Sequence, residues 1–567
     1  MTAVRRLITL MLLSLFATAL LAQGTPAAGR TTEPVTAETD QDVNNPRALQ
    51  LSLDQALRNS IQNNLGVQLQ EYTYQEAGYS LRSQYGIYDL LGTALLQEQS
   101  EESPVTSTIS SNASRVHTFN VGVQQNLPTG GGYSFSVNNR RQATSGGVST
   151  VNPLYSPSVG FAVNQPLLRD FGIDVYRRGI TIARNTLGIN HEAFRTTLMN
   201  TAVSVEQAYL NLVYARRAVE VVKQSLFLAR DQARITQIRI DVGASAPLDI
   251  LQPRVTIATT EEQLITAAAN VRSAEDQLRQ LMNLPITEWD RPIIPTDPVD
   301  YAPVPIDTDA AVRMALERRP EMRQDELATD TARVQYLYAR NQTLPTLDFN
   351  LDYGLGGVAG TTPERDPITH ELTGRLERIP YGRGLRQIFE GDFPSWTIGF
   401  NVGVPITNIG ARAEAKRAEL ALKQSRLTRE QTRQNITVDV RQAARDVDTA
   451  ARSITATRAA RDAAERNVEA ERKRYENGMT TNFQVLQVQQ QLSDARVREL
   501  QALVGYNQAV STFHRAVGDV LEVRNITVDV PELPSEPHIF SSLDRYNWLN
   551  YGSRVHLEET PNEPGSH

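Results

Sequence analysis

The sequence predicts a mainly α-helical protein that also carries membrane β-strands, built as two tandem repeats and closed into a hollow structure by several copies. Two observations predict the repeats. Similar glycine-centred turns, at Gly243 and Gly478, each join two long helical segments, and runs with alternating apolar residues precede each long segment. The third observation is an export-type N-terminus, which favours a membrane environment for those runs.

The two turns match each other along the chain. From about Ala411 to the turn at Gly478 there is no Gly or Pro, and a second charged segment then continues to about Val517. The same pattern occurs earlier, where Gly243 corresponds to Gly478 and the Leu251–Gln252 step corresponds to Leu486–Gln487. Each turn therefore predicts an antiparallel hairpin of two long helices.

Residues 1–22 have the pattern of a secretory signal, with Arg5 and Arg6 before an apolar run and small residues near its end. A membrane anchor is the weaker alternative, because the run falls short of the roughly 20 residues of a spanning helix. The chain has no cysteine, and no later stretch is apolar enough to cross a membrane as a helix. A mature chain that enters a membrane would therefore do so through its strands.

The first repeat is expected over residues 49–284, after a disordered lead-in at 23–48. A helix from Leu53 to about Arg82 opens the repeat and leads to strands within 87–166. The period places five apolar residues on one face of this helix: Ala56, Leu57, Ile61, Leu65 and Leu69. A long hairpin follows at 174–284, where Pro247 is tolerated in the first turn of the return helix and Pro253 predicts a kink.

The strands alternate strictly between apolar and small or polar residues. Phe119, Val121 and Val123 alternate with Asn120 and Gly122, and the runs near 135 and 161 do the same. Such alternation fits a half-buried sheet of any kind. Together with the export signal and the long helices, it favours a barrel with lipid outside and water inside over a sandwich.

A proline-rich connector at 285–308, with six prolines, separates the repeats. The second repeat is expected over 309–520, with a first helix, strands within 345–405 that enclose one large loop, and a long hairpin at 411–520. Residues 521–567 are expected to form an irregular, mostly unpacked tail.

Narrow apolar stripes mark the helices of the second hairpin. From Ile436 to Ile454, and from Leu503 to Val520, apolar residues recur with a mean period of 3.5, which predicts helices that supercoil around neighbours. In both repeats the first helix and the return helix together match the long helix in length, so they can stack end to end beside it. This arrangement favours a hollow cylinder. A fibrous coiled coil would share the stripes but would not explain the strands.

The order of helix, strands, long helix, turn and return helix, given twice, resembles the TolC-type outer-membrane efflux and secretion ducts over about residues 50–520. The matching segments are Leu51 to Leu57, Asn164 to Leu167, and Tyr475 with Gly478 and Leu486. The resemblance implies a homotrimer whose α-helical tunnel crosses the periplasm and continues into an outer-membrane β-barrel. It also implies that the tips dock to a periplasmic adaptor of an inner-membrane pump, and that cargo passes through passively.

The resemblance also implies site residues. Family members close the periplasmic mouth with aspartates six and nine residues after the tip glycine; here these positions include Asp249 in the first tip and Gln484 and Gln487 in the second. The two glutamines argue against a strongly acidic aperture, and solvated helix surface is the alternative for all three residues. The residues expected to dock the adaptor are Gly243, Ala244, Ser245, Tyr475, Gly478, Met479 and Thr480.

Other classes of function find little support in the sequence. The seven histidines are scattered without metal-ligand spacing, and Gly130 to Gly132 form a turn before a strand, so we expect no catalytic residues, metal or cofactor. A formal charge of −7 argues against nucleic acid as a partner. The competing interpretation is a periplasmic adaptor or scaffold without a pore, which would need one hairpin rather than two.

The number of strands leads to a further hypothesis. The first repeat contains four strand segments, at about 87–97, 116–126, 132–142 and 157–166, and the second contains two, at about 345–355 and 396–405. The family resemblance implies four strands per copy, whereas this count gives six, or eighteen in a trimer. The alternative is that the extra hairpin folds outside the barrel wall.

Overall fold

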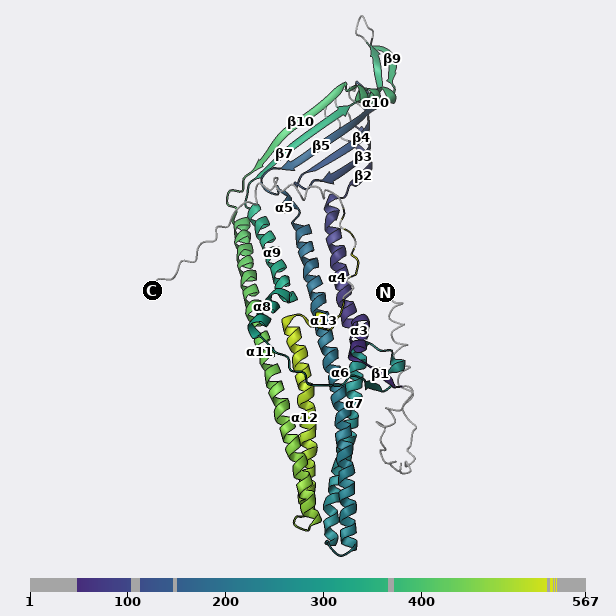
Figure 1. Cartoon of the computed structure of the whole chain (residues 1–567). Helices are drawn as coiled ribbons and strands as arrows, with labels where there is room; N and C mark the ends of the chain where they lie inside the picture. The colour runs from purple at the N-terminus through teal and green to yellow at the C-terminus, as the bar shows by residue number, and fades with distance from the viewer. Residues whose placement is uncertain are drawn as a thin grey trace, which may run out of the picture.

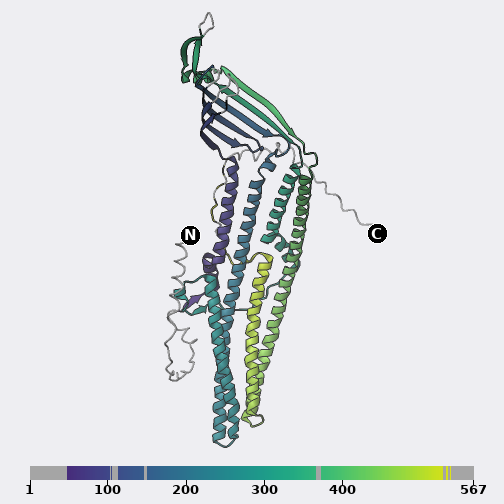
Figure 2. The same cartoon turned by 180° about the vertical axis from the view of Figure 1, so that it is seen from behind.

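The computed structural model describes residues 48–102, 104, 113–145, 150–365, 372–527, 531–533, 535 and 537. Long helices form one end of the molecule and a β-sheet forms the other, with both glycine-centred turns at the helical end (Figure 1 and Figure 2). The elements follow the predicted order in both repeats. The expected signal and lead-in, residues 1–47, lie outside the described residues, as does most of the expected tail.

The first helix of each repeat is broken in two at matching places. In the first repeat Asn64 separates α3 (Leu53–Asn63) from α4 (Leu65–Gln84), and its side chain accepts hydrogen bonds from two backbone N–H groups of the next turn. In the second repeat Arg319 separates α8 (Thr308–Arg318) from α9 (Pro320–Asn341). Each break redirects the chain from the middle of the molecule toward the sheet.

The break at Asn64 changes which residues are buried. Ala56 and Leu57, from the predicted apolar face, are buried in α3, and Val67 is buried in α4. Leu65 and Leu69 are exposed in the single chain, so the prediction of one continuous apolar face was wrong for these two residues. The reason is that the extended backbone at Asn64 interrupts the helical period on which the prediction relied.

The long hairpins have the predicted lengths. The long helix α6 has 64 residues, while α3, α4 and α7 have 11, 20 and 32; in the second repeat α11 has 68, while α8, α9 and α12 have 11, 22 and 36. The shorter helices therefore match the long helix beside them, which spans about 100 Å at 1.5 Å per residue. The bounds are α5 (Ile173–Tyr176), α6 (Arg178–Asp241), α7 (Leu251–Met282), α11 (Ile409–Glu476) and α12 (Asn482–Val517).

The kink at Pro253 stays a prediction, and the helix type changes just before this residue. Pro253 is the third residue of α7, which follows the 3-10 turn η2 (Pro247–Ile250). Proline cannot donate to a carbonyl of the preceding turn, so its place at the junction of the 3-10 turn and α7 keeps the loss of helical hydrogen bonds small.

Two hydrophobic cores lie midway along the helices, where the short helices meet. One surrounds α3, α6 and α7, and the other surrounds α8, α11 and α12. In the second core Ile436, Val440 and Ile454 are at most 1 % exposed, and Tyr506 and Val517 contact them from α12. The predicted stripes therefore form the helix seams.

The strands form one antiparallel sheet in the order β10-β7-β5-β4-β3-β2. All four segments predicted in the first repeat are present and neighbour one another, and β5 pairs with β7 of the second repeat. The extra hairpin, β2 and β3, thus continues the plane of the sheet. The bounds are β2 (Leu91–Glu102), β3 (Ala113–Asn126), β4 (Gly132–Ser145), β5 (Leu154–Pro166), β7 (Thr346–Gly356) and β10 (Phe393–Gly403).

The strand register places the apolar residues on one face, because residues directly opposite each other in antiparallel strands share a face. Phe161 pairs with Phe135 on one side and Tyr353 on the other, and Tyr353 pairs with Trp396. The apolar face comprises Ala94, Leu96, Phe119, Val121, Val123, Tyr133, Phe135, Val137, Val159, Phe161, Val163, Phe349, Leu351, Tyr353, Trp396, Ile398 and Phe400.

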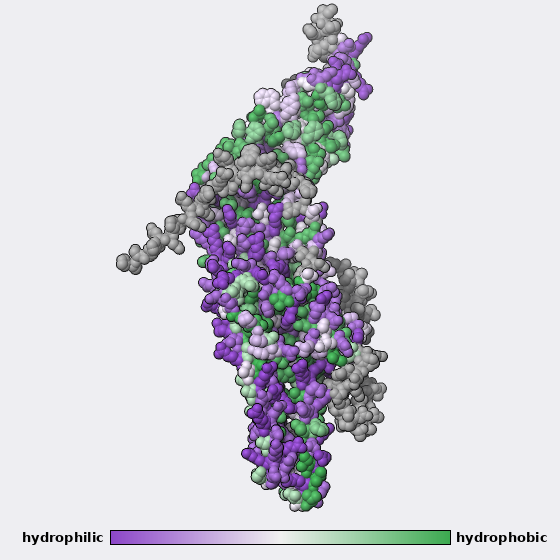
Figure 3. Space-filling model, viewed as in Figure 1, coloured by the Kyte–Doolittle hydropathy of each residue, from purple (hydrophilic) through white to green (hydrophobic). Residues whose placement is uncertain are grey.

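The opposite face of the sheet is polar or small over its central strands, with Ser136, Gly160 and Asp352 among its residues. Apolar residues gather over the sheet between the hydrophilic helices and the hydrophilic outer hairpin (Figure 3). No helix in the described part of the chain is both long and apolar enough to span a membrane.

The loop expected between the strands of the second repeat contains regular elements. It contains β8 (Ala359–Arg365), β9 (Leu372–Ile379) and α10 (Tyr381–Glu390), which lie at the end of the sheet farthest from the helices (Figure 1). The two short strands hold Gly, Pro and charged residues without alternation, so the sequence pattern did not reveal them.

The connector between the repeats is anchored to the first core. Its strand β6 (Ile293–Pro295) pairs in parallel with β1 (Leu49–Leu51). The Tyr209 hydroxyl lies 2.9 Å from the Asp297 carboxylate and 3.1 Å from the Leu51 carbonyl, and burial raises the pKa of Tyr209 to about 12. The start of the tail is packed as well, since α13 (Val520–Val523) and Ile526 contact the cores.

Candidate functional site at the hairpin tips

The first tip is closed by a glycine in the left-handed region. Gly243 has a φ of 76°, its N–H donates to the Ile240 carbonyl, and the Ala244 N–H donates to the Arg239 carbonyl at 2.7 Å. Side chains with a Cβ are strained at such a φ, which is why glycine ends the helix here. The next helical turn starts at Pro247, as predicted.

The second tip repeats this geometry. Gly478 has a φ of 73°, its N–H donates to the Tyr475 carbonyl, and the Met479 N–H donates to the Arg474 carbonyl at 2.9 Å. The side chain of Thr481 then caps α12 by accepting from the Gln484 N–H. The correspondence predicted between the two turns therefore extends to their hydrogen bonds.

The predicted docking residues fall into two groups. Gly243, Ala244, Gly478 and Met479 are exposed at the ends of the hairpins, while Ser245 and Thr480 are half-buried. Tyr475 is only 6 % exposed, so it lies inside the tip rather than on its surface.

Tyr475 joins the two hairpins. The guanidinium carbon of Arg239, from the first hairpin, lies 4.4 Å from the centre of the Tyr475 ring, and Arg239 also donates to the Tyr475 carbonyl at 3.0 Å. A second link joins Gln232 to buried Asn482 at 2.7 Å. The two tips are therefore held together within one copy.

The predicted aperture residues are exposed. The Asp249 carboxylate accepts a hydrogen bond from the Ala246 N–H at 3.1 Å, so it caps the return helix and keeps its charge at the surface. Gln484 and Gln487 lie on α12 of the second tip and are exposed as well.

Of the apolar surface of the tips, sequence reasoning identified only Met479. Val242, Leu248, Met479 and Phe483 are each at least 58 % exposed within a few residues of the two glycines. Exposed apolar residues of this size at a shared end of the molecule are typical of a protein-binding surface. Their position beside the turn glycines was visible in the sequence, but their exposure was not.

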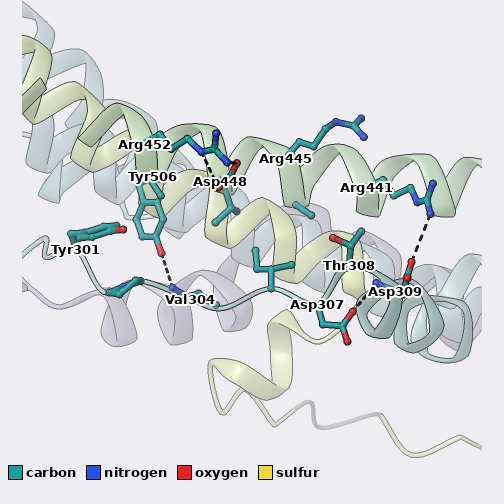
Figure 4. A pocket seen from close by; sticks show the side chains of 15 residues that line it. Tyr301, Val304, Asp307, Thr308, Asp309, Arg441, Arg445, Asp448, Arg452 and Tyr506 are labelled. Atoms are coloured by element: carbon teal, nitrogen blue, oxygen red, sulfur yellow. Dashed lines mark hydrogen bonds and ion pairs between the residues drawn. The ribbon is translucent and has the colours of Figure 1, made fainter. Parts of the chain in front are cut away.

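A groove midway along the helices holds none of the predicted site residues. The connector passes α11 and α12 there, and Tyr506 accepts from the Val304 N–H at 3.2 Å (Figure 4). Its charged groups are largely paired with one another, as in the contact of Arg452 with Asp448 at 2.8 Å. The groove is therefore best explained as a junction between the connector and the helices.

Among the described residues no group of three or more His, Cys, Asp or Glu side chains is placed to hold a metal ion. The features with potential for function are the tips at one end and the sheet at the other. A sheet with one apolar face, joined to two long hairpins with matching tips, is the arrangement expected from the sequence for an outer-membrane duct.

Comparison with known proteins agrees with this class. The family description "Outer membrane efflux protein" matches residues 133–284 and 311–519, and the chain belongs to this family. It is therefore an outer-membrane duct for efflux or secretion.

Individual relatives are distant. The outer membrane protein TolC of Escherichia coli is 23 % identical over 359 residues, which cover 61 % of this chain and 68 % of TolC. The alkaline protease secretion protein AprF of Pseudomonas aeruginosa is 23 % identical over 342 residues, covering 59 % of this chain and 64 % of AprF. The Campylobacter jejuni CmeC outer membrane channel superposes with a TM-score of 0.61 at 15 % identity, covering 89 % of this chain and 92 % of CmeC.

Proposed function

We propose that three copies of this chain form one passive duct that carries small molecules or polypeptides through the outer membrane and across the periplasm. The observation that carries the proposal is the placement of an apolar sheet face and a pair of matched tips at opposite ends of helices about 100 Å long. The end with the apolar sheet face suits lipid, and the end with the two tips suits a protein partner.

The edges of the sheet support closure by further copies. Strands β2 and β10, with 12 and 11 residues, have neighbours on one side only within the described sheet. Unpaired backbone groups cost several kcal/mol each in hydrocarbon, so the edges must be covered in a membrane. Pairing β2 of one copy with β10 of the next would close a barrel of eighteen strands in a trimer.

The tips support docking to a periplasmic adaptor of an inner-membrane pump. The exposed apolar residues Val242, Leu248, Met479 and Phe483 would form the contact, with the two turn glycines setting its shape. In the same proposal Asp249, Gln484 and Gln487 line the mouth of the duct. The chain would contribute a passage and a docking site, with no reaction of its own.

Single-channel recording of the purified assembly tests the proposal. A duct requires recovery from the outer-membrane fraction, a trimer on a mildly denaturing gel, and stepwise conductance in a planar bilayer. The competing function is a periplasmic scaffold without a pore. A monomer in the soluble periplasmic fraction that gives no conductance would establish that alternative.

A further inference from the structure

Helix α10 lies against the outer end of the apolar face of the sheet. The rings of Tyr381 and Tyr155 meet edge to face at 6.1 Å, and Tyr155 belongs to the same side of β5 as Phe161. A Cβ placed on Gly384 would lie 3.3 Å from the Pro157 ring, and Pro157 is buried. The helix therefore packs on the side of the sheet that would face lipid.

The position of α10 is fixed by close contacts. The backbones of Gly384 and Gly357 approach so closely that a Cβ on Gly357 would clash with the Gly384 carbonyl oxygen. The Gln387 side chain accepts from the Val358 N–H at 2.9 Å, and Ile388 is 7 % exposed. The helix is thus a fixed element at the outer end of the sheet.

The free surface of α10 has an apolar edge and a cationic edge. Phe389 is 90 % exposed and Leu385 is 39 % exposed, one turn apart on the same side. Arg383 and Arg386 are exposed on the adjoining surface together with one acid, Glu390, and neither arginine forms an ion pair within the described parts of the chain. Such a division between apolar and cationic edges is typical of a helix that lies in a membrane interface.

A third arginine extends the cationic surface onto the sheet. Arg141 of β4 donates to the Tyr155 hydroxyl at 3.2 Å and lies 5.8 Å from the centre of that ring. In the register it follows Phe135, Val137 and Asn139 on the apolar face, so it stands where that face turns polar. We call Arg141, Arg383 and Arg386, with Tyr155 and Tyr381, the rim patch.

We propose that the rim patch binds the phosphate groups of a phosphorylated lipid in the outer leaflet, while Phe389 and Leu385 contact its acyl chains. Guanidinium groups bind phosphate through paired, charge-assisted hydrogen bonds. The aromatic residues occupy the girdle position at the edge of the apolar band. The inference rests on the proposed membrane placement of the sheet.

The proposal is tested by measuring lipid binding to the purified full-chain assembly in detergent, with bis-phosphorylated lipid A and with the same lipid lacking its phosphates. The double variant Arg383→Gln/Arg386→Gln should weaken binding of the phosphorylated lipid about tenfold, because it removes charge-assisted hydrogen bonds. The matched control, Arg426→Gln/Arg429→Gln on α11, removes the same charge far from the sheet and should leave binding unchanged.

One further variant should strengthen binding. Glu390 lies one turn after Arg386 and repels phosphate, so Glu390→Gln should raise the affinity for the phosphorylated lipid. Equal affinity for the two lipids, or an equal loss in the control variant, would overturn the proposal. So would displacement of the lipid by inorganic phosphate alone.

A measurement that leaves the arginines intact covers the case in which the double variant does not assemble. A fluorophore on Phe389→Cys should be quenched by lipids spin-labelled near the headgroup and not by a water-soluble quencher. The same fluorophore on Phe135→Cys reports whether the sheet is in the bilayer. Quenching by lipid at position 135 but not at 389 would sink this inference alone, whereas no quenching at either position would refute the membrane placement itself.

Discussion

Arg319 connects three elements at the point where α8 ends and α9 begins. Its guanidinium contacts both carboxylate oxygens of Glu321, at 2.8 and 3.2 Å, and lies 3.2 Å from Asp439 of α11. Burial alone would raise the pKa of Glu321, but the hydrogen bond and charge of Arg319 outweigh burial and hold that pKa below its usual value of 4.5. The ion pair therefore stabilises the redirected chain.

Replacing Glu321 with Gln should lower stability at neutral pH by about 1–3 kcal/mol, since Arg319 is 9 % exposed and loses its bidentate partner. A group with a lowered folded pKa stabilises above its unfolded pKa and loses that effect as the pH falls through the folded value. The difference in melting temperature between parent and variant should therefore shrink in acid, as circular dichroism at neutral pH and at about pH 3 can check.

The matched control for this prediction is Glu469→Gln. Glu469 accepts a hydrogen bond from Lys473 at 2.9 Å, which lowers its pKa, but both side chains are 69 % exposed. Exposed pairs contribute little because water and salt screen them. A larger loss of stability in Glu469→Gln than in Glu321→Gln would contradict this account.

Gly478 gives the second hairpin tip its shape. Its φ of 73° strains any residue with a Cβ, and a β-branched residue most of all. Gly478→Val should abolish transport while leaving trimer assembly and membrane insertion intact, measured by dye efflux and by gel. Gly410→Val, in the first turn of α11 where an added Cβ meets nothing within 4 Å, is the control. Unchanged efflux in Gly478→Val would remove the proposed docking role of the tip.

The turn that joins α6 to α7 carries one exposed carboxylate, that of Asp249. Asp249→Asn keeps a side-chain oxygen for the Ala246 N–H but removes the charge. If three copies of Asp249 face the axis, the variant should show weaker cation selectivity in single-channel recordings, and the effect should be larger at low salt. Glu262→Gln, farther along the exposed surface of α7, should leave selectivity unchanged. Equal selectivity in Asp249→Asn and its parent would place Asp249 on the outer surface of the mouth.

For the whole molecule, the decisive question is whether the extra hairpin belongs to the membrane wall. Its strand β3 continues the apolar face, since Val121 pairs with Val137 and Val123 pairs with Phe135. In an eighteen-strand wall, cysteines at Phe119 and Phe135 should react only with a lipid-soluble label. Cysteines at Asn120 and Ser136, on the opposite face, should react only with a water-soluble one.

Labelling in intact outer membranes checks this prediction, with Gly410→Cys as a water-exposed control at the start of α11. If the residues at 119 and 120 react equally with the water-soluble label while those at 135 and 136 do not, the extra hairpin lies outside the wall. Equal reactivity at 135 and 136 would reject the eighteen-strand barrel as a whole.

Much of the fold follows from local patterns. The turn glycines, the seams of period 3.5 and the alternating strands depend on residues close in sequence, so they could be predicted from the chain alone. The position of Asp249, shortly after the turn glycine Gly243, could also be predicted from the chain alone. The exposure of the apolar tip residues could not be predicted, because burial depends on which helices lie side by side.

The tertiary structure alone decided the rest, because it depends on contacts between distant segments. The Asn64 side-chain amide donates to the Leu281 carbonyl of the other end of the repeat, and Arg319 pairs with Asp439 of α11. The burial of Tyr475 likewise involves Arg239 from the other hairpin. The attachment of α10 to the apolar face depends on Gly384 meeting Pro157, some 230 positions earlier in the chain. The sequence by itself determined which elements form and in what order, whereas long-range packing determined which of their surfaces remain free to bind lipid or protein.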